Sequence, residues 1–477
     1  MNNDILTQHR RWRFAGLALL YAAVMLYSST VIGPAGINFV YRAPAEALRL
    51  FLATPYVEHG SDQRADWIGN LMMLVPFGFI VAGALWPRRV LLRIPAAIAA
   101  MALCIWVILA IKYLQLFFPP RTVTLNYIIA QTVGAAIGCC GWAAWHVRMN
   151  RLAARRDLVG AFVLALSLYS GALILFTLMP LDFALDSDDL AAMLRRVPST
   201  VWAIPGTGRP PQVRAVLVFM AGAAFIPVGM LLTFTRRGVY RVTRGLPAVT
   251  ILGLLLTTGV YALSSLVISA FPVAPSILYR TLGIVIGAAA LRWLVRQPPD
   301  ALRLWLRRAA PFLAVPYLVG VLVVNQLISR YWMSWHQVVQ QAYPLGLLPL
   351  FDYYIVTKAE AAKNIVGHVA LYLPVGVLFW MRYGQGAVGR AGVVAGLLSL
   401  CVEVARYFRP GLEGDFNAVV VAGLAAMMGA IAMPGVWSMF KALHRHSVST
   451  PARLWSDRTK HDDLARFNSV ADDIEYF

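Results

Sequence analysis

Long apolar runs separated by short polar connections dominate the chain. A helix needs about 20 consecutive apolar residues to cross the ~30 Å hydrocarbon core of a bilayer. The pattern predicts twelve such helices, at about 14–33, 67–86, 92–117, 124–146, 158–180, 213–235, 246–271, 276–295, 311–329, 362–381, 388–408 and 415–440. The predicted fold is therefore all-α, a polytopic transmembrane helical protein.

Composition agrees with this prediction. Of the 477 residues, 59% are hydrophobic and only 13% are charged, and the mean hydropathy is +0.66. Soluble domains are about 45–50% apolar and about 25% charged, so this chain has too little polar surface to coat a water-soluble globule. The sequence contains no phosphate-binding Walker motif and no H-E-x-x-H. We therefore expect no cofactor and no metal.

Positive charge is concentrated in alternate connections between the apolar runs. The net charge is +20, and the clustered Lys and Arg residues fall at 87–89, 146–157, 236–244, 292–308 and 382–390. Cytoplasmic loops of membrane proteins carry such an excess. The pattern predicts that both termini are cytoplasmic. It also makes membrane lipids, and not nucleic acid, the expected partners.

A short Pro-x-Gly pattern occurs three times at nearly equal spacing. The pairs are Pro76 with Gly78, Pro227 with Gly229 and Pro374 with Gly376, and the prolines are 151 and 147 residues apart. This spacing predicts a four-helix unit in three copies, at 10–157, 158–308 and 309–440, followed by a polar and loosely ordered cytoplasmic tail at 441–477. Each pair falls in the second helix of its unit, where proline is expected to kink the helix.

Other parts of the unit recur as well. "YIIAQTVGAAIG" (127–138) aligns without a gap with "SILYRTLGIVIG" (276–287), and 111–126 aligns with 402–417. Small residues let helices approach closely, so we expect close helix packing at Gly134, Gly138, Gly283 and Gly287. Each long connection after a unit's first helix contains an amphipathic stretch, which we expect to lie at the outer membrane interface: 44–53, 188–197 and 336–343.

Polar residues are expected to gather at the outer ends of the first and third units. These ligand-binding candidates are, in the first unit, Asn70, Gln115, Arg121 and Asn126, and in the third, Asn364, His368, Glu403, Arg406, Arg409, Asp415 and Asn417. A charge within a membrane is costly and usually faces a cavity or a partner. These residues therefore mark the part of each unit where a function is expected.

Three interpretations of the polar residues in the third unit stay open. Glu403 and Arg406 could form an ion pair that holds helix ends together. A pocket could receive an anionic lipid headgroup, because guanidinium groups bind phosphate bidentately. His368 with Glu403 could act in general acid–base catalysis, although no nucleophile or metal set accompanies them.

The order of these motifs resembles the VanZ-like family, whose name-giving member is linked to low-level resistance to the glycopeptide teicoplanin. The first unit resembles the family pattern at Asn70, Pro76, Gly78, Gln115, Arg121, Gly134 and Gly138, and departs from it at Lys112, Tyr127 and Gln131. The third unit resembles it at Asn364, Pro374, Gly376, Glu403 and Gly429, and departs at Arg406 and Leu412. The second unit keeps Pro227, Gly229, Gly283 and Gly287 and little of the polar set.

The resemblance implies a multi-pass protein of the bacterial cell envelope, in the inner (plasma) membrane. We expect it to bind an anionic lipid, a lipid-linked cell-wall precursor or a glycopeptide at the outer face, without chemistry, and to give glycopeptide tolerance. Two alternatives are a lipid or small-molecule transporter or flippase, and a membrane enzyme acting on a lipid-linked substrate.

Overall fold

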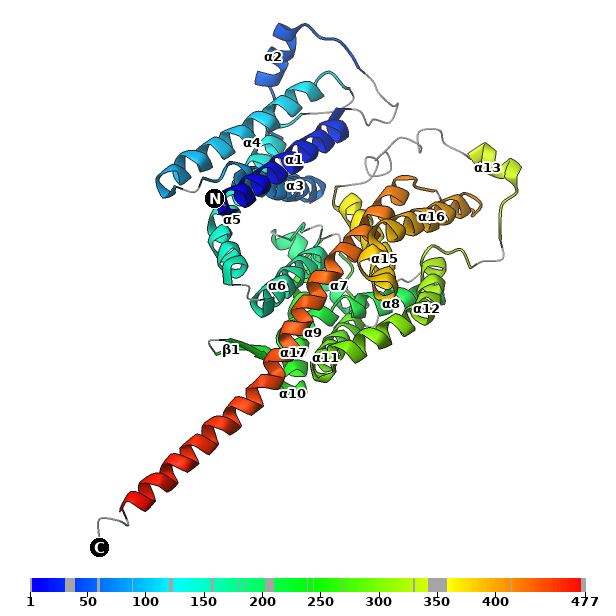
Figure 1. Cartoon of the computed structure of the whole chain (residues 1–477). Coiled ribbons are helices and arrows are strands. Elements are labelled where there is room, and N and C mark those ends of the chain that lie inside the picture. The colour runs from blue at the N-terminus through cyan, green and yellow to red at the C-terminus, as the bar shows by residue number, and fades with distance from the viewer. Residues whose placement is uncertain are drawn as a thin grey trace.

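The computed structural model is built almost entirely of helices (Figure 1). It describes residues 2–30, 39–57, 61–87, 89–119, 123–155, 158–179, 181–184, 186–201, 210–237, 239–242, 244–268, 270–328, 331–341, 358–412 and 414–472. Arg121, one of the ligand-binding candidates, lies outside these residues.

The N-terminal bundle comprises α1 (Asn2–Thr30), α2 (Pro44–Leu52), α3 (Ser61–Leu85), a 3₁₀ turn η1 (Val90–Leu92), α4 (Arg93–Gln115) and α5 (Leu125–Arg155). Its core includes Leu74, Phe77, Cys104, Ile108 and Trp142, all at most 2% exposed. α1 closes the bundle because Phe14 packs edge-on against Trp142 and Tyr21 stacks on Phe77.

The middle bundle comprises α6 (Leu158–Thr177), α7 (Ser187–Val201), α8 (Pro211–Ala223), α9 (Ile226–Leu232), α10 (Leu246–Ser264) and α11 (Pro275–Arg296). Strands β1 (Phe234–Arg237) and β2 (Val239–Val242) form an antiparallel hairpin between α9 and α10. The sequence pattern predicted only a basic connection there. Its Val, Tyr, Thr and Phe residues favour extended backbone, which explains the hairpin.

The C-terminal bundle comprises α12 (Pro299–Val324), α13 (Trp335–Gln341), α15 (Lys358–Tyr383), a 3₁₀ turn η3 (Gly384–Gly386), α16 (Ala387–Tyr407) and α17 (Asn417–Asp472). α17 continues through residue 441 as one helix and projects away from the bundles (Figure 1). The expected loosely ordered tail is thus helical as far as Asp472.

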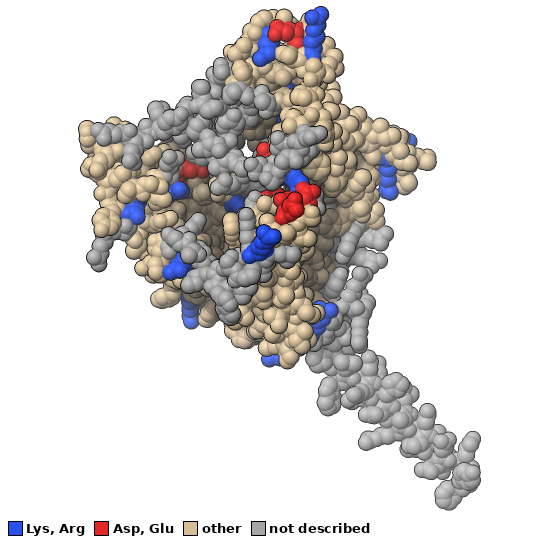
Figure 2. Space-filling model, turned by 180° about the vertical axis from the view of Figure 1, so that it is seen from behind, with Lys and Arg blue, Asp and Glu red and all other residues tan. Residues whose placement is uncertain are grey.

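Eleven spans among the described residues are long and apolar enough to cross a membrane, with α8 and α9 counted as one. α1 is also a helix, but its apolar run continues past Thr30 into residues outside the described set. Charged side chains are sparse over the face seen in Figure 2. The prediction of an all-α polytopic membrane protein is confirmed.

The three Pro-x-Gly pairs differ in what they do to their helices. α3 and α15 continue through Pro76 and Pro374 without a break. In the middle bundle the helix is interrupted at Ala224–Phe225, and Pro227 lies in the first turn of α9. Proline suits a first turn, where its missing N–H is not needed.

The glycine of each pair approaches the backbone of the bundle's last helix. An added Cβ at Gly78 would overlap the Ala135 carbonyl oxygen, and at Gly229 it would overlap the Ile284 oxygen. At Gly376 it would overlap the Ala426 oxygen. The last helices return this contact. Gly134 and Gly138 each face a carbonyl of α3, Gly429 faces one of α15, and Gly283 and Gly287 face carbonyls of α8 and α9. The same backbone crossing therefore occurs once in each bundle.

The third predicted helix of each unit also buries the same positions. The buried residues include, on α4, Ala100, Cys104, Ile108, Ile111, Lys112 and Gln115; on α10, Val249, Gly253, Thr257, Val260 and Ser264; and on α16, Ala391, Ala395, Ser399, Val402 and Glu403. The positions on α10 and α16 follow those on α4 at constant distances of 149 and 291 residues. These recurring contacts support the division into three units, which stays a prediction.

Candidate functional site

The N-terminal bundle contains a buried amide pair between α3 and α5. Gln131 Nε2 donates a hydrogen bond of 2.8 Å to Asn70 Oδ1, and the two residues are 5% and 1% exposed. Asn70 Nδ2 in turn donates to the Asp66 carbonyl oxygen at 2.8 Å. Glycine at positions 78, 134 and 138 lets the two helices come close enough for this pair to form.

A second pair of buried polar side chains lies on α4. Lys112 Nζ donates to Gln115 Oε1 at 3.1 Å and lies 5.8 Å from the centre of the Tyr127 ring. The Tyr127 hydroxyl donates to Asp66 Oδ2 at 3.4 Å. We call Asp66, Asn70, Lys112, Gln115, Tyr127 and Gln131 the N-terminal cluster.

Asn126 precedes Tyr127 and organises a connection. Its Nδ2 donates to the Val57 carbonyl oxygen at 2.5 Å, and its Oδ1 accepts from the Val57 N–H at 3.0 Å. This two-way contact ties the segment after α2 to the start of α5. Asn126 therefore acts here as a clamp on the backbone.

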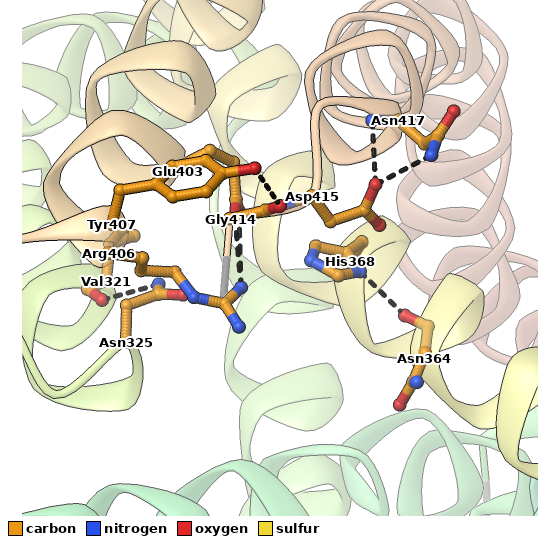
Figure 3. Close-up of polar contacts among 10 residues, drawn as sticks. All are labelled: Val321, Asn325, Asn364, His368, Glu403, Arg406, Tyr407, Gly414, Asp415 and Asn417. Carbon is orange, nitrogen blue, oxygen red and sulfur yellow. Dashed lines mark hydrogen bonds and ion pairs between the residues drawn. The ribbon is translucent and has the colours of Figure 1, made fainter. Parts of the chain in front are cut away.

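The C-terminal bundle holds a fully buried carboxylate. Glu403 on α16 is 0% exposed. Its Oε2 accepts from Arg406 Nη1 at 3.1 Å and from the Asp415 backbone N–H at 2.9 Å. The ion-pair interpretation of Glu403 and Arg406 is therefore what the structure shows, and the pair also holds the turn that leads into α17 (Figure 3).

The turn itself is fixed by two further contacts. Asp415 Oδ1 accepts from both the backbone N–H and Nδ2 of Asn417 at 2.8 Å, which satisfies a donor at the start of α17. The Tyr407 hydroxyl donates to the Gly414 carbonyl oxygen at 3.1 Å. Asp415 and Asn417 thus hold the beginning of the helix.

His368 on α15 faces this cluster from the other side (Figure 3). Its Nδ1 lies 2.9 Å from the Asn364 carbonyl oxygen. No hydrogen bond joins His368 to Glu403 within the described residues. The general acid–base pair considered from the sequence has no direct contact here. We call Asn364, His368, Glu403, Arg406 and Asp415 the C-terminal cluster.

Two nearby residues have other roles. Arg409 donates to the Tyr331 carbonyl oxygen and lies 5.8 Å from the centre of the Trp332 ring, so it fastens the connection before α13. Asn325, which follows the last residue of α12, was missed by sequence reasoning. Its Nδ2 donates a hydrogen bond of 2.9 Å to the Val321 carbonyl oxygen. Among the described residues no group of three or more His, Cys, Asp or Glu side chains could hold a metal ion.

The close glycine contacts recur in both bundles, and they show which residues of the two clusters correspond. Pro76 and Pro374 are 298 residues apart, and the same distance takes Asn70 to His368 and Asp66 to Asn364. The sequence comparison had put Asn364 in the place of Asn70, one helical turn too early. On the next helix Lys112 corresponds to Glu403 and Gln115 to Arg406, so the buried charge at this position has opposite signs in the two bundles.

Sequence reasoning missed Asp66 and treated Tyr127 and Gln131 only as departures from a pattern. Asp66 is four residues before Asn70, so the two share one helix face, and this spacing could have revealed it. Tyr127 and Gln131 could not have been assigned partners, because their contacts are with α3, about sixty positions away in the chain.

These features define a class, namely α-helical multi-pass membrane proteins with buried polar clusters beside tight glycine crossings. Residues 14–146, which contain the N-terminal cluster, match the model of the VanZ/LLP1 family. The resemblance to the VanZ-like family is confirmed over those residues. Searches of curated proteins and of solved structures found no match.

Proposed function

We propose that the C-terminal cluster binds an anionic headgroup, the phosphate of a membrane lipid or of a lipid-linked cell-wall precursor, at the outer membrane face. The observation that carries this proposal is the state of Arg406. Glu403 engages only its Nη1, and Nε and Nη2 pair with no residue that the structure describes. The side chain is 24% exposed, so a ligand can reach part of it.

The Glu403 carboxylate prepares Arg406 for a ligand. It fixes the guanidinium in one orientation, so less side-chain entropy is lost when an anion binds. A fixed fork of donors matches the oxygen spacing of phosphate. Asn364 is exposed and His368 is partly exposed on the opposing helix, so both can add hydrogen bonds to the same headgroup.

The N-terminal cluster supports a different role. Asn70, Gln131, Lys112 and Gln115 satisfy one another inside the bundle and are at most 6% exposed. Such a network stabilises helix–helix packing in a membrane. We therefore place ligand binding in the C-terminal bundle and assign a structural role to the polar residues of α3, α4 and α5.

A binding comparison tests the proposal. Purified protein would be titrated with vesicles of phosphatidylglycerol in phosphatidylcholine, with vesicles of phosphatidylcholine alone, and with vesicles that carry lipid II. We expect tighter binding of the anionic vesicles, and Arg406→Gln should weaken it about tenfold, the effect of roughly 1.4 kcal/mol. Arg382→Gln, an exposed arginine at the far end of α15, is the matched control. Equal affinity for all vesicles, or no effect of Arg406→Gln, would overturn the proposal.

A cellular experiment extends this test to glycopeptide tolerance. The chain would be expressed in a teicoplanin-susceptible bacterium beside its Arg406→Gln and Arg382→Gln variants. We expect the wild-type chain and Arg382→Gln to raise the inhibitory concentration of teicoplanin, and Arg406→Gln to raise it less. An identical increase in inhibitory concentration from all three proteins would show that tolerance does not depend on Arg406.

A further inference from the structure

The middle bundle carries an arginine within one of its membrane-spanning helices. Arg280 is the sixth residue of α11, and most of its side chain is removed from solvent. Its Nε is completely buried and has no hydrogen-bond partner in the part of the chain that the structure describes. The guanidinium carbon lies 5.5 Å from the centre of the Phe225 ring, which belongs to the break between α8 and α9.

Comparison with the N-terminal bundle shows what this arginine replaces. Gly134 and Gly283 make the same backbone contact and are 149 residues apart, which puts Arg280 in the place of Gln131. The partner of Gln131 is Asn70, and its place, 151 residues on, is taken by Ala221. The middle bundle thus has a cation and a methyl group where the N-terminal bundle has two neutral amides that hydrogen-bond to each other.

Nothing described in the protein balances this charge. Arg280 forms no ion pair with any carboxylate among the described residues, and the Phe225 ring offers only a weak cation–π attraction. A cation inside a membrane is expensive unless a partner compensates it. About 8 Å of helix separates Arg280 from the start of α11, at 1.5 Å per residue, so its guanidinium can reach the level of lipid headgroups.

We propose that Arg280 binds one phosphate-bearing anion where α8, α9 and α11 meet. The planar guanidinium can hold two phosphate oxygens at once, and the break before Pro227 brings the aromatic ring under the bound group. The middle bundle would then be a binding unit in its own right, independent of Arg406 and of the function proposed for the C-terminal cluster.

Native mass spectrometry provides the test, with lipids counted after purification in detergent that contains phosphatidylglycerol. The main variant is Ala221→Asn with Arg280→Gln, which rebuilds the Asn70–Gln131 pair in the middle bundle and therefore removes the cation with a replacement contact. Arg280→Lys keeps the charge but not the fork. Arg382→Gln, at an exposed arginine in the last turn of α15, serves as the control.

We expect the double variant to retain one phosphatidylglycerol fewer than the wild-type protein, Arg280→Lys to bind it several times more weakly, and Arg382→Gln to keep it. A parallel titration with inorganic phosphate, in detergent without lipid, identifies the source of the anion. Phosphate binding that depends on Arg280 would support a free anion, and its absence beside lipid loss would support a headgroup. Unchanged lipid and phosphate binding in the double variant, with its thermal stability retained, would overturn the proposal.

Discussion

Gln131 and Asn70 are joined by a 2.8 Å hydrogen bond at the crossing of α5 and α3, where both side chains are almost fully buried. Their contact connects two helices that the chain separates by about sixty residues. The glycines around them allow the close approach, and the amides make use of it. At this crossing, close packing at glycine and a hydrogen bond between two amides hold the same two helices together.

Removing both amides of the pair should cost less than the two single removals added together. Asn70→Leu leaves the Gln131 amide buried without its partner, and we expect a loss of about 1–2 kcal/mol in unfolding free energy. Asn70→Leu with Gln131→Leu should cost less than the sum of the two single variants. Thermal unfolding in detergent, followed by cysteine-reactive fluorescence, measures this. Strict additivity would argue against a direct contact.

The glycine crossings should be sensitive to one methyl group. Gly78→Ala and Gly376→Ala each introduce a Cβ against a carbonyl oxygen of the opposing helix, and we expect each to cost about 1–3 kcal/mol through forced backbone displacement. Gly171→Ala on α6 is the control, because nothing lies within 4 Å of its added Cβ. Equal melting temperatures for the three variants would contradict the observed crossings.

Lys112 and Glu403 carry opposite charges at corresponding positions. This suggests that Glu403→Lys with Arg406→Gln can give the C-terminal bundle the residues of the N-terminal one. Arg406→Gln alone leaves Glu403 buried without its cation, and Glu403→Lys alone places two cations together, so each should cost about 3–5 kcal/mol. The double variant recreates the Lys112–Gln115 pair seen at the same position in the N-terminal bundle. We expect it to melt at a higher temperature than either single variant. A double variant less stable than both would refute the equivalence of the two positions.

One buried hydroxyl should be dispensable. Tyr372 is 0% exposed and its hydroxyl makes no hydrogen bond within 3.5 Å to any residue that the structure describes, whereas Phe225 occupies the corresponding place in the middle bundle. Tyr372→Phe removes an unsatisfied polar group without leaving a large cavity, so we expect stability to be unchanged or raised by up to about 1 kcal/mol. A clear fall in melting temperature would reveal a polar partner, such as a buried water.

The proposed orientation can be tested by labelling single cysteines in a background with the four native cysteines replaced by serine. Asp186 has a side chain that is 67% exposed in a predicted outer connection, and Arg89 is exposed in a predicted cytoplasmic one. An impermeant maleimide should label Asp186→Cys in intact cells and label Arg89→Cys only after lysis. The reverse result would place both termini outside the cytoplasm.

Much of the architecture could be predicted from residue patterns. The apolar runs became helices, and the stretches beginning at Pro44, Asp188 and His336 became α2, α7 and α13 or parts of them. The tail after residue 441 is helical although its polar composition predicted loose order. A polar segment that continues a membrane helix needs no nucleation and can remain helical. The hairpin at β1 and β2 was missed for a similar reason, since four-residue strands give only a weak periodic signal.

The candidate site was predicted less completely. Glu403 with Arg406 could be paired in advance, because three residues along a helix bring side chains to one face. The roles of Asn126 and Arg409 could not, since their partners are backbone carbonyls of Val57 and Tyr331 in distant connections. Every residue has a backbone carbonyl, so the sequence does not mark which one will be a partner.

The sequence by itself determined which segments enter the membrane, where small residues permit contact, and which polar residues must find partners, because hydrophobicity and residue size act locally. Only the tertiary structure decided which partner each polar group takes. It joined Gln131 to Asn70, placed His368 in the corresponding position, and left Arg280 without a carboxylate among the described residues. Those choices depend on how each helix is rotated against its neighbour, and that rotation is set by the packing of the whole bundle.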